Sequence, residues 1–149
     1  KAHLFQTSKE ITEKYAADGI KAYISVNKAL VTQSSAAIPI VPLYISILYK
    51  VMKEKGVHEG CIEQMYRLFA EKFGADGKPV SGAVDGEGRI RLDDLEMKPE
   101  IQDEVTKLWN ILNADNFKEY TDIEGYWKDF YELFGFGIDG VDYEADVEV

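Results

Sequence analysis

The sequence predicts an α/β fold that is mostly helical with few strands. Apolar residues recur at spacings of three and four over long segments, which is typical of helices that bury one face. Short runs of strand-forming residues separate these segments, and this alternation is the pattern of α/β proteins. A polar step, residues 32–35, follows the first such run and precedes the most apolar stretch of the chain. Because α/β folds bind ligands at the carboxyl ends of strands, we expect the functional site at this step.

The size and charge of the chain limit the classes of function. The chain has 149 residues, of which 46% are hydrophobic, so it is long enough to form one domain or part of a larger one. Its formal net charge is -10, which repels phosphate backbones and anionic lipid surfaces. We therefore do not expect unspecialised binding to nucleic acids or membranes.

The single cysteine, Cys61, excludes an internal disulfide and a multi-cysteine zinc site. We interpret it as a small, half-buried residue near a helix start, because the neighbouring Glu59 and Glu63 disfavour a thiolate. The apolar run 38–49 is too short for a membrane span and contains two prolines, so we expect it to be core.

The first two elements in chain order are a surface helix over residues 3–17 and a short buried strand over residues 22–26. Asp18-Gly19 is a suitable helix stop, and residues 22–26 are rich in strand formers. The apolar helix positions are Leu4, Ile11 and Tyr15.

After the polar step, the apolar spacing predicts a helix that ends at Lys55, with Gly56 as a left-handed cap. Pro42 disfavours helical geometry at Val41, so we expect an irregular entry with backbone amides free for a ligand. The positions that carry the pattern are Val41, Tyr44, Leu48, Val51 and Met52.

A second helix is predicted from His58 to Gly74. We interpret His58-Glu59 as a solvated helix start. A zinc-protease motif is excluded because Ile62 stands where its second histidine belongs. The apolar stripe consists of Ile62, Met65, Tyr66, Phe69 and Phe73.

Residues 74–96 are rich in turn formers, with a short strand predicted at residues 89–92. The segment Asp85–Asp94 faintly resembles a calcium loop, but its ligand positions fit poorly, and a polar hairpin is the favoured interpretation.

Two amphipathic helices and a tail complete the chain. One helix begins at Pro99, and the other begins at a capping box of Thr121 and Glu124 and stops at Gly135. A last short strand is predicted within residues 135–143, before a frayed acidic end. The expected buried positions are Ile101, Val105, Leu108, Trp109 and Leu112 in the first helix and Ile123, Tyr126, Trp127, Phe130 and Phe134 in the second.

The residues alone indicate no reaction. Asp93-Asp94 is expected to face solvent or cap a helix, and neither His3 nor His58 has a nucleophile nearby in the sequence. We expect no metal site, no G-x-G-x-x-G dinucleotide fingerprint and no P-loop.

Several long segments, in order, closely resemble the trans-2-enoyl-coenzyme A reductase family, which includes bacterial enoyl-acyl-carrier-protein reductases. The resemblance spans almost the entire chain. The matching segments are residues 28–44, 50–56, 58–64, 88–94, 103–105 and 135–143.

The resemblance implies a monomeric, Rossmann-type (short-chain-dehydrogenase-like) reductase. Such an enzyme transfers a hydride from NADH, or from NADPH in some members, to the C2–C3 double bond of an enoyl-CoA or enoyl-ACP thioester in fatty acid synthesis. Residues 1–149 resemble only the carboxyl-terminal portion of a single enoyl reductase domain. The remaining amino-terminal part is thus an implied partner, and the piece alone is expected to be inactive.

Four site residues follow from matching the family's motifs. Lys1 matches the lysine of a Tyr…Lys catalytic pair, so the resemblance makes it catalytic and cofactor-binding. Leu30, Val31 and Thr32 match the element beside the nicotinamide and pyrophosphate. The alternative for this step is helix N-capping by Thr32, Ser34 or Ser35.

The helix after Pro39 resembles the wall of the family's acyl pocket. The substrate-binding candidates on it are Ile40, Leu43, Tyr44 and Ile47.

Two alternatives remain open. A truncated or split homologue would act as a non-catalytic structural subunit of a larger assembly, and a calcium-binding module at residues 83–94 is a weaker option. We expect the cytoplasm if the source is bacterial and a mitochondrion if it is eukaryotic. Acyl-chain length and the choice between NADH and NADPH do not follow from these residues.

Overall fold

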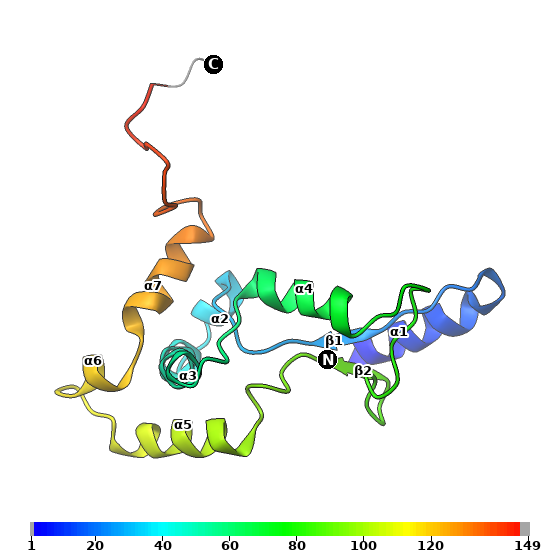
Figure 1. Ribbon diagram of the computed structural model, residues 1–149, viewed down its shortest axis with the longest axis horizontal. Helices are drawn as coiled ribbons and strands as arrows, with labels where there is room; N and C mark the ends of the chain where they lie inside the picture. The colour runs from blue at the N-terminus through cyan, green and yellow to red at the C-terminus, as the bar shows by residue number, and fades with distance from the viewer. Residues whose placement is uncertain (1, 147–149) are drawn as a thin grey trace. The chain divides into compact units, whose positions relative to one another are not determined.

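The computed structural model describes residues 2–146 of the chain (Figure 1). Helices dominate, and the two strands form one small parallel sheet, so the predicted mostly helical α/β composition is confirmed. In chain order the elements are α1 (Ala2–Lys14), η1 (Ala16–Asp18), β1 (Ile24–Val26), α2 (Gln33–Ala36), α3 (Val41–Glu54), α4 (Cys61–Glu71), β2 (Arg89–Arg91), α5 (Pro99–Ile111), α6 (Phe117–Tyr120) and α7 (Ile123–Glu132).

The chain divides into two compact units. Unit 1 consists of Lys1–Lys28 and Glu59–Met97, and unit 2 consists of Ala29–His58 and Lys98–Val149. The assignment of residues 1–149 to a single reductase domain stays a prediction.

Unit 1 contains the parallel pair β1 and β2, in which Ile24 lies opposite Arg89 and Val26 opposite Arg91. Parallel neighbours need a long crossover between them, and here the crossover includes α4. All three β1 residues are half-buried rather than fully buried as predicted. The core of the unit consists of Leu68, Ile90 and Leu92, against which Tyr23, Met65, Phe73 and Val84 pack.

The turn-rich segment between α4 and β2 forms the predicted polar hairpin. The Asp85 carboxylate accepts hydrogen bonds from the backbone N–H groups of Glu87 and Arg89, both at 2.9 Å. It also accepts one from Arg89 Nε at 2.7 Å. These backbone bonds, with the arginine, lower the pKa of Asp85. The carboxylate therefore closes its own turn.

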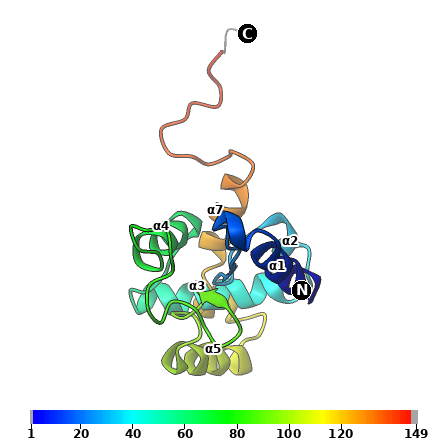
Figure 2. The ribbon, with the colours of Figure 1, turned by 90° about the vertical axis from the view of Figure 1, so that its right-hand side faces the viewer.

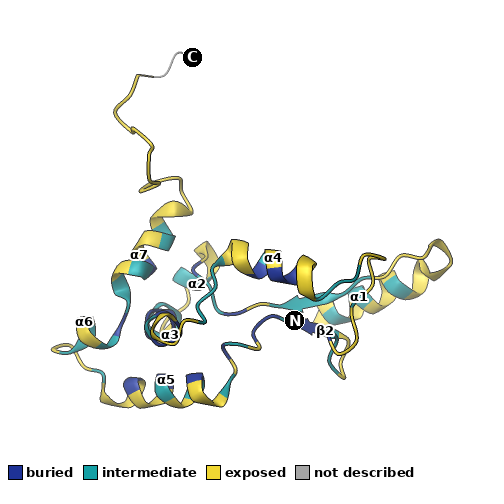
Figure 3. Cartoon of the chain, in the orientation of Figure 1, coloured by how far each residue is buried: buried dark blue, intermediate teal, exposed yellow. Residues whose placement is uncertain are grey.

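Helix α4 has the predicted periodicity, but most of its apolar stripe faces solvent (Figure 3). Ile62 is 77% exposed, Tyr66 is 74% exposed and Phe69 is 69% exposed. The inner positions are held instead by Gln64 and Arg67, whose polar groups are bonded inside unit 1. The predicted half-burial of Cys61 is also wrong, because this first residue of α4 is exposed.

Unit 2 is organised around α3, which is seen end-on in Figure 1 and along its length in Figure 2. Helices α5 and α7 both pack against it. Five consecutive residues, 45–49, are completely buried, so the second part of the predicted run 38–49 is core, whereas Ile38 and Ile40 at its start are exposed. None of the helices within residues 2–146 is both long enough and apolar enough to cross a bilayer. The core consists of Val31, Ile45, Tyr49 and Tyr126.

Both ends of α3 agree with the prediction. Gly56 has a φ of 66°, the left-handed geometry that glycine adopts without strain, and its N–H donates to the Lys53 carbonyl. At the entry, Ile40 has a φ of 73°, unusual for a β-branched residue, so the entry is irregular as predicted; Val41 is nevertheless the first helical residue, so the expected loss of helical geometry there is wrong.

The carboxyl-terminal region differs from the prediction. Asp122 caps α7 by accepting the Gly125 N–H at 3.1 Å, whereas Thr121, which follows the last residue of α6, donates its hydroxyl to the carbonyl of Phe117, the first residue of that helix. The predicted capping box is therefore wrong, because Thr121 is already engaged by a helix that the periodicity missed.

The predicted burial of the α7 aromatics and the predicted last strand are also wrong. Tyr126 is buried, but Trp127 and Phe134 are 46% and 47% exposed. No strand forms within residues 135–146, where the recorded hydrogen bonds are local, such as Val141 N–H to the Ile138 carbonyl. A strand needs a neighbouring edge to pair with, and this segment has none within its described residues.

Candidate functional site

The polar step folds into the short helix α2, with Thr32 as its N-cap. Thr32 Oγ1 accepts the Ser35 N–H at 3.0 Å, and Ser35 Oγ accepts the Thr32 N–H at 2.8 Å. Ser35 Oγ also donates to the Leu30 carbonyl at 2.9 Å. This is a reciprocal capping box, so the capping interpretation holds for Thr32 and Ser35. The backbone amides of Thr32 and Ser35 are therefore engaged, and at the entry of α3, where free amides were expected, the Val41 N–H donates to the Ile38 carbonyl at 3.3 Å.

Leu30, Val31 and Thr32, which were predicted to bind the cofactor, differ in how far they are exposed. Val31 is 6% exposed and packs in the core of unit 2, whereas Thr32 is exposed. Leu30 is half-buried, and its carbonyl is engaged by Ser35. Of these three side chains, only that of Thr32 is exposed, and its hydroxyl already accepts the Ser35 N–H.

A groove of about 340 Å³ lies in unit 2, between the entry of α3 and helix α5. At the groove, Gln102 Nε2 donates a hydrogen bond to Tyr44 Oη at 3.2 Å. An apolar groove with a small polar element is typical of a site for an apolar chain bearing a polar group. The groove is lined by Ile40, Val41, Tyr44, Gln102, Val105, Thr106 and Trp109.

The groove brings together two of the four predicted substrate-binding residues. Ile40 and Tyr44 line it, whereas Ile47 is fully buried and Leu43 is half-buried outside the lining. Ile40 is 66% exposed and combines this exposure with its positive φ. Backbone outliers of this kind cluster at ligand sites, because strain persists only where the surrounding structure imposes it.

A buried polar contact that the sequence reasoning missed joins α3 to α7. Tyr49 Oη donates to Asp129 Oδ2 at 2.7 Å, and the His58 ring lies edge-on to the Tyr49 ring with centroids 4.5 Å apart. Burial, followed by the bond to Asp129 and its charge, raises the pKa of Tyr49 well above its usual range. The predicted solvated position of His58 is therefore wrong. A tyrosine amid buried aliphatic residues was the available signal, because its hydroxyl needs a partner.

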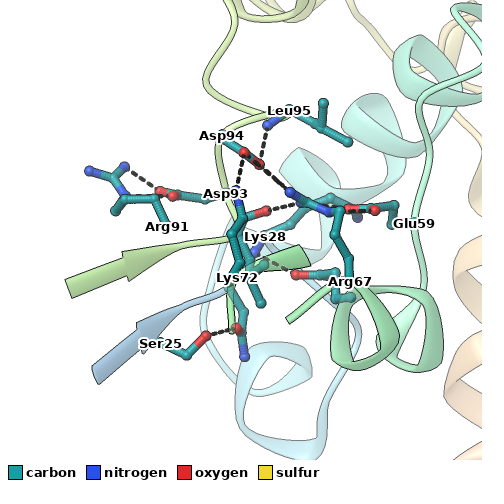
Figure 4. Close-up of polar contacts among 12 residues, drawn as sticks. Ser25, Lys28, Glu59, Arg67, Lys72, Arg91, Asp93, Asp94 and Leu95 are labelled. Carbon is teal, nitrogen blue, oxygen red and sulfur yellow. Dashed lines mark hydrogen bonds and ion pairs between the residues drawn. The ribbon is translucent and has the colours of Figure 1, made fainter. Parts of the chain in front are cut away.

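An ion-pair cluster in unit 1 was also missed (Figure 4). Arg67 donates to both oxygens of Glu59, at 2.7 and 2.8 Å, and to Asp94 and the Leu92 carbonyl, each at 2.8 Å. Lys72 Nζ lies 3.2 Å from Asp94.

These contacts shift the pKa values of Arg67 and Asp94. Burial disfavours the charged forms of Arg67 and Asp94, but the hydrogen bonds and ion pairs that each of them makes outweigh this effect. The pKa of Arg67 is therefore raised and that of Asp94 is lowered. Both groups stay charged at neutral pH, so the cluster ties α4 to the segment after β2.

The tail contains glycines at the spacing G-x-G-x-x-G, at residues 135–140. In a dinucleotide site this pattern follows a strand and opens a helix. Here it follows α7, no helix is assigned after it up to residue 146, and the Ile138 N–H donates to Tyr143 Oη at 2.9 Å. The segment therefore lacks the context of a dinucleotide loop, despite its spacing.

Lys1, the predicted catalytic and cofactor-binding lysine, lies outside the described residues. Among residues 2–146, no group of three or more His, Cys, Asp or Glu side chains is placed to hold a metal ion.

Two family models match consecutive parts of the chain. The model of the trans-2-enoyl-CoA reductase catalytic region matches residues 1–73, and the model of the enoyl reductase FAD binding domain matches residues 84–147. Together they cover nearly the whole sequence, in agreement with the resemblance found in its segments.

Curated relatives are similar over the full chain. The trans-2-enoyl-CoA reductase [NADH] of Ruminiclostridium cellulolyticum is 56% identical over 100% of this chain and 37% of the relative. The enoyl-[acyl-carrier-protein] reductase [NADH] of Coxiella burnetii is 55% identical, with 100% and 36% covered. The chain thus spans little more than a third of the length of these relatives.

Solved structures show the same likeness in three dimensions. The Clostridium acetobutulicum trans-2-enoyl-CoA reductase in complex with NADH superposes with a TM-score of 0.87 at 49% identity, covering 97% of this chain and 36% of the other. The Treponema denticola enzyme in complex with NAD gives 0.86 at 45% identity, covering 98% and 36%.

Proposed function

Because this chain belongs to the trans-2-enoyl-CoA reductase family, we propose that it forms part of an NADH-dependent enoyl thioester reductase. The observation that carries the proposal is 56% identity over the whole chain to a relative named for this activity. The substrate class is an enoyl-CoA or enoyl-acyl-carrier-protein thioester, and the product is the saturated thioester. The chain acts as the carboxyl-terminal portion of a monomeric enzyme of fatty acid synthesis.

The cofactor would supply the hydride that reaches the β-carbon of the double bond. Thr32 fits a contact to it, because its side chain is exposed after β1. Lys1, by its place in the family motif, holds the cofactor ribose and assists the catalytic tyrosine of the amino-terminal part. Leu30 and Val31 support Thr32, Leu30 through its carbonyl and Val31 through its burial in the core.

The acyl chain occupies the groove between α3 and α5. Its methylene groups contact Ile40 and Tyr44 at the entry of α3 and Trp109 on α5, which together provide apolar surface. Ile47 and Leu43 act from behind this surface by holding α3 in place, since neither lines the groove.

A flavin does not fit the residues matched by the second family model. Acidic side chains far outnumber basic ones between residues 84 and 147, and a flavin dinucleotide carries an anionic pyrophosphate. The guanidinium groups of Arg89 and Arg91 are already paired with Asp85 and Asp93. We derive no step through a flavin.

A chimera tests the proposal. The part of the Ruminiclostridium relative that this chain does not span is joined to this chain, and NADH oxidation with crotonyl-CoA is followed at 340 nm. The chimera is expected to turn over and the isolated 149 residues are not, because the tyrosine of the family motif lies outside them. The matched variant Thr32→Val keeps the shape and removes the hydroxyl, and it is expected to raise KM for NADH.

A folded chimera without turnover would contradict the reductase proposal and favour the structural-subunit alternative. Turnover by the isolated chain would contradict the proposal that these 149 residues hold only part of the active site.

We further propose a cytoplasmic location, since the relatives named above come from bacteria. Cell fractionation with an antibody against the chain tests the location.

A further inference from the structure

The hydroxyl of Tyr49 lies inside unit 2, on the central helix α3, and has partners in two other segments. Its Oη donates to Asp129 Oδ2 of α7 at 2.7 Å. Burial raises the pKa of Tyr49, and the Val31 N–H, which donates to the hydroxyl oxygen, opposes this rise. Val31 and Tyr49 also pack in the same buried cluster. Tyr49 therefore joins α7 to the segment that precedes α2.

The chemistry of the two partners makes this contact directional. A phenol has one O–H donor and an oxygen that also accepts, whereas a carboxylate only accepts. Asp129 therefore fixes the direction of the Tyr49 O–H and leaves the oxygen lone pairs for the Val31 N–H. Without an acceptor at Asp129, the hydroxyl would rotate toward other acceptors. The pair thus acts in sequence, since Asp129 orients Tyr49 and Tyr49 holds the backbone of Val31.

Residues 30–32, which we call the cofactor segment, depend on side chains for their backbone hydrogen bonds. The segment lies between β1 and α2, where no helix or strand is assigned. Ser35 Oγ donates to the Leu30 carbonyl at 2.9 Å and accepts the Thr32 N–H at 2.8 Å. Both bonds come from the adjoining helix α2, so they shape the segment locally. The bond to the Val31 N–H comes from α3 and ties the middle of the segment to the core.

We propose that Tyr49 and Asp129 are positioning residues for the nicotinamide cofactor, acting through the backbone of the cofactor segment. The proposal rests on the proposed function, because it needs the cofactor to lie beside this segment. Tyr49 acts through Val31, and Asp129 acts through Tyr49, so neither has to touch the cofactor. A segment held in one conformation spares the entropy that a mobile one would lose on binding.

The affinity of the chimera for NADH tests the proposal, because isothermal titration calorimetry measures it without turnover. Tyr49→Phe keeps the ring in the core and removes the hydroxyl. Asp129→Ala removes the acceptor, whereas Asp129→Asn keeps an acceptor oxygen. Lys53→Met is the matched control, since Lys53 Nζ makes another bond from α3 to α7, to its cap Asp122 at 2.6 Å. This control weakens the same helix pair and leaves the Tyr49 hydroxyl in place.

We expect the Kd for NADH to rise about fivefold in Tyr49→Phe and in Asp129→Ala, the effect of one lost hydrogen bond. Asp129→Asn and Lys53→Met should stay within about twofold of the unsubstituted chimera. KM for NADH should rise with the Kd while kcat changes little, because the segment acts on binding. In Tyr49→Phe, the Val31 N–H should exchange with deuterium about tenfold faster relative to the Ile45 N–H.

Equal weakening of NADH binding in Tyr49→Phe and Lys53→Met would assign both effects to the general stability of unit 2 and overturn the proposal. An unchanged exchange of the Val31 N–H in Tyr49→Phe would overturn it as well. A chimera that binds NADH without turning over contradicts the reductase proposal alone, since the dissociation constants still decide the positioning role. A folded chimera that binds no NADH contradicts both.

Discussion

Replacing Arg67 by methionine is expected to be the most damaging single change to unit 1. The side chain of Arg67 is 10% exposed and that of its partner Glu59 is 14% exposed, so both charges are removed from most of their water. Removing one member of a buried pair leaves the other uncompensated, which costs about 3–5 kcal/mol. Asp94 is 41% exposed and adds little to this figure because solvent screens it.

The lower end of that range, about 3 kcal/mol, is the expected loss, because Glu59 keeps some contact with water. For a chain of this size the melting temperature should fall by roughly 6–12 °C. Urea unfolding at pH 7, followed by circular dichroism at 222 nm, measures the loss. Lys72→Met is the matched control and should lose less than about 1 kcal/mol, since its contact with Asp94 is longer and more exposed.

The double variant Glu59→Gln with Arg67→Met should recover part of the loss, because it removes the stranded charge. A loss below about 1 kcal/mol for Arg67→Met, or a loss that vanishes in 1 M salt, would refute the reasoning. Either result would mean that the cluster behaves as an exposed surface pair and does not hold α4 in place.

Four further substitutions test unit 2 and the acid response of unit 1. Tyr49→Phe should cost about 1–2 kcal/mol in the same urea experiment, because a hydrogen bond to a charged acceptor is lost. Ile40→Gly should stabilise the chain by about 1 kcal/mol by relieving its positive φ, whereas Gly56→Ala should destabilise it by a similar amount, and opposite signs would contradict the assigned geometry. The folded pKa of Asp94 is lowered, so its stabilisation is complete above the unfolded value of about 3.9 and is lost as pH falls through the folded pKa. Asp94→Asn should therefore flatten the decline of the melting temperature below pH 4, and an unchanged decline would exclude this group as its cause.

Local patterns along the sequence were sufficient for the main elements of unit 2. The sequence pattern predicted the end of α3 to within one residue and the start of α5 at Pro99, because helical periodicity depends only on neighbours in the chain. Gly56 and the Pro42 entry were also readable, since both act through the backbone of adjacent residues. The family followed from whole segments whose order is preserved.

Contacts between distant segments were decided only by the tertiary structure. The pairing of Tyr49 with Asp129 joins residues 80 positions apart, and no local pattern specifies such a partner. The capping box shows that Thr32 caps α2 together with Ser35, which is one of the two roles that the sequence left open for this step. Next to this capping box, Val31 is buried and Thr32 is exposed.

The orientation of α4 shows why the sequence specified the helices and the tertiary structure decided the contacts between distant segments. Its periodicity is the same whether the apolar stripe faces a core or solvent, so the sequence by itself determined that a helix forms with one apolar side. The inward bonds of Gln64 and Arg67 are made to residues distant in sequence, and they decided which side faces out. The chain alone therefore specified its helices and its family. Only the three-dimensional placement of buried polar groups decided that the apolar side of α4 remains exposed.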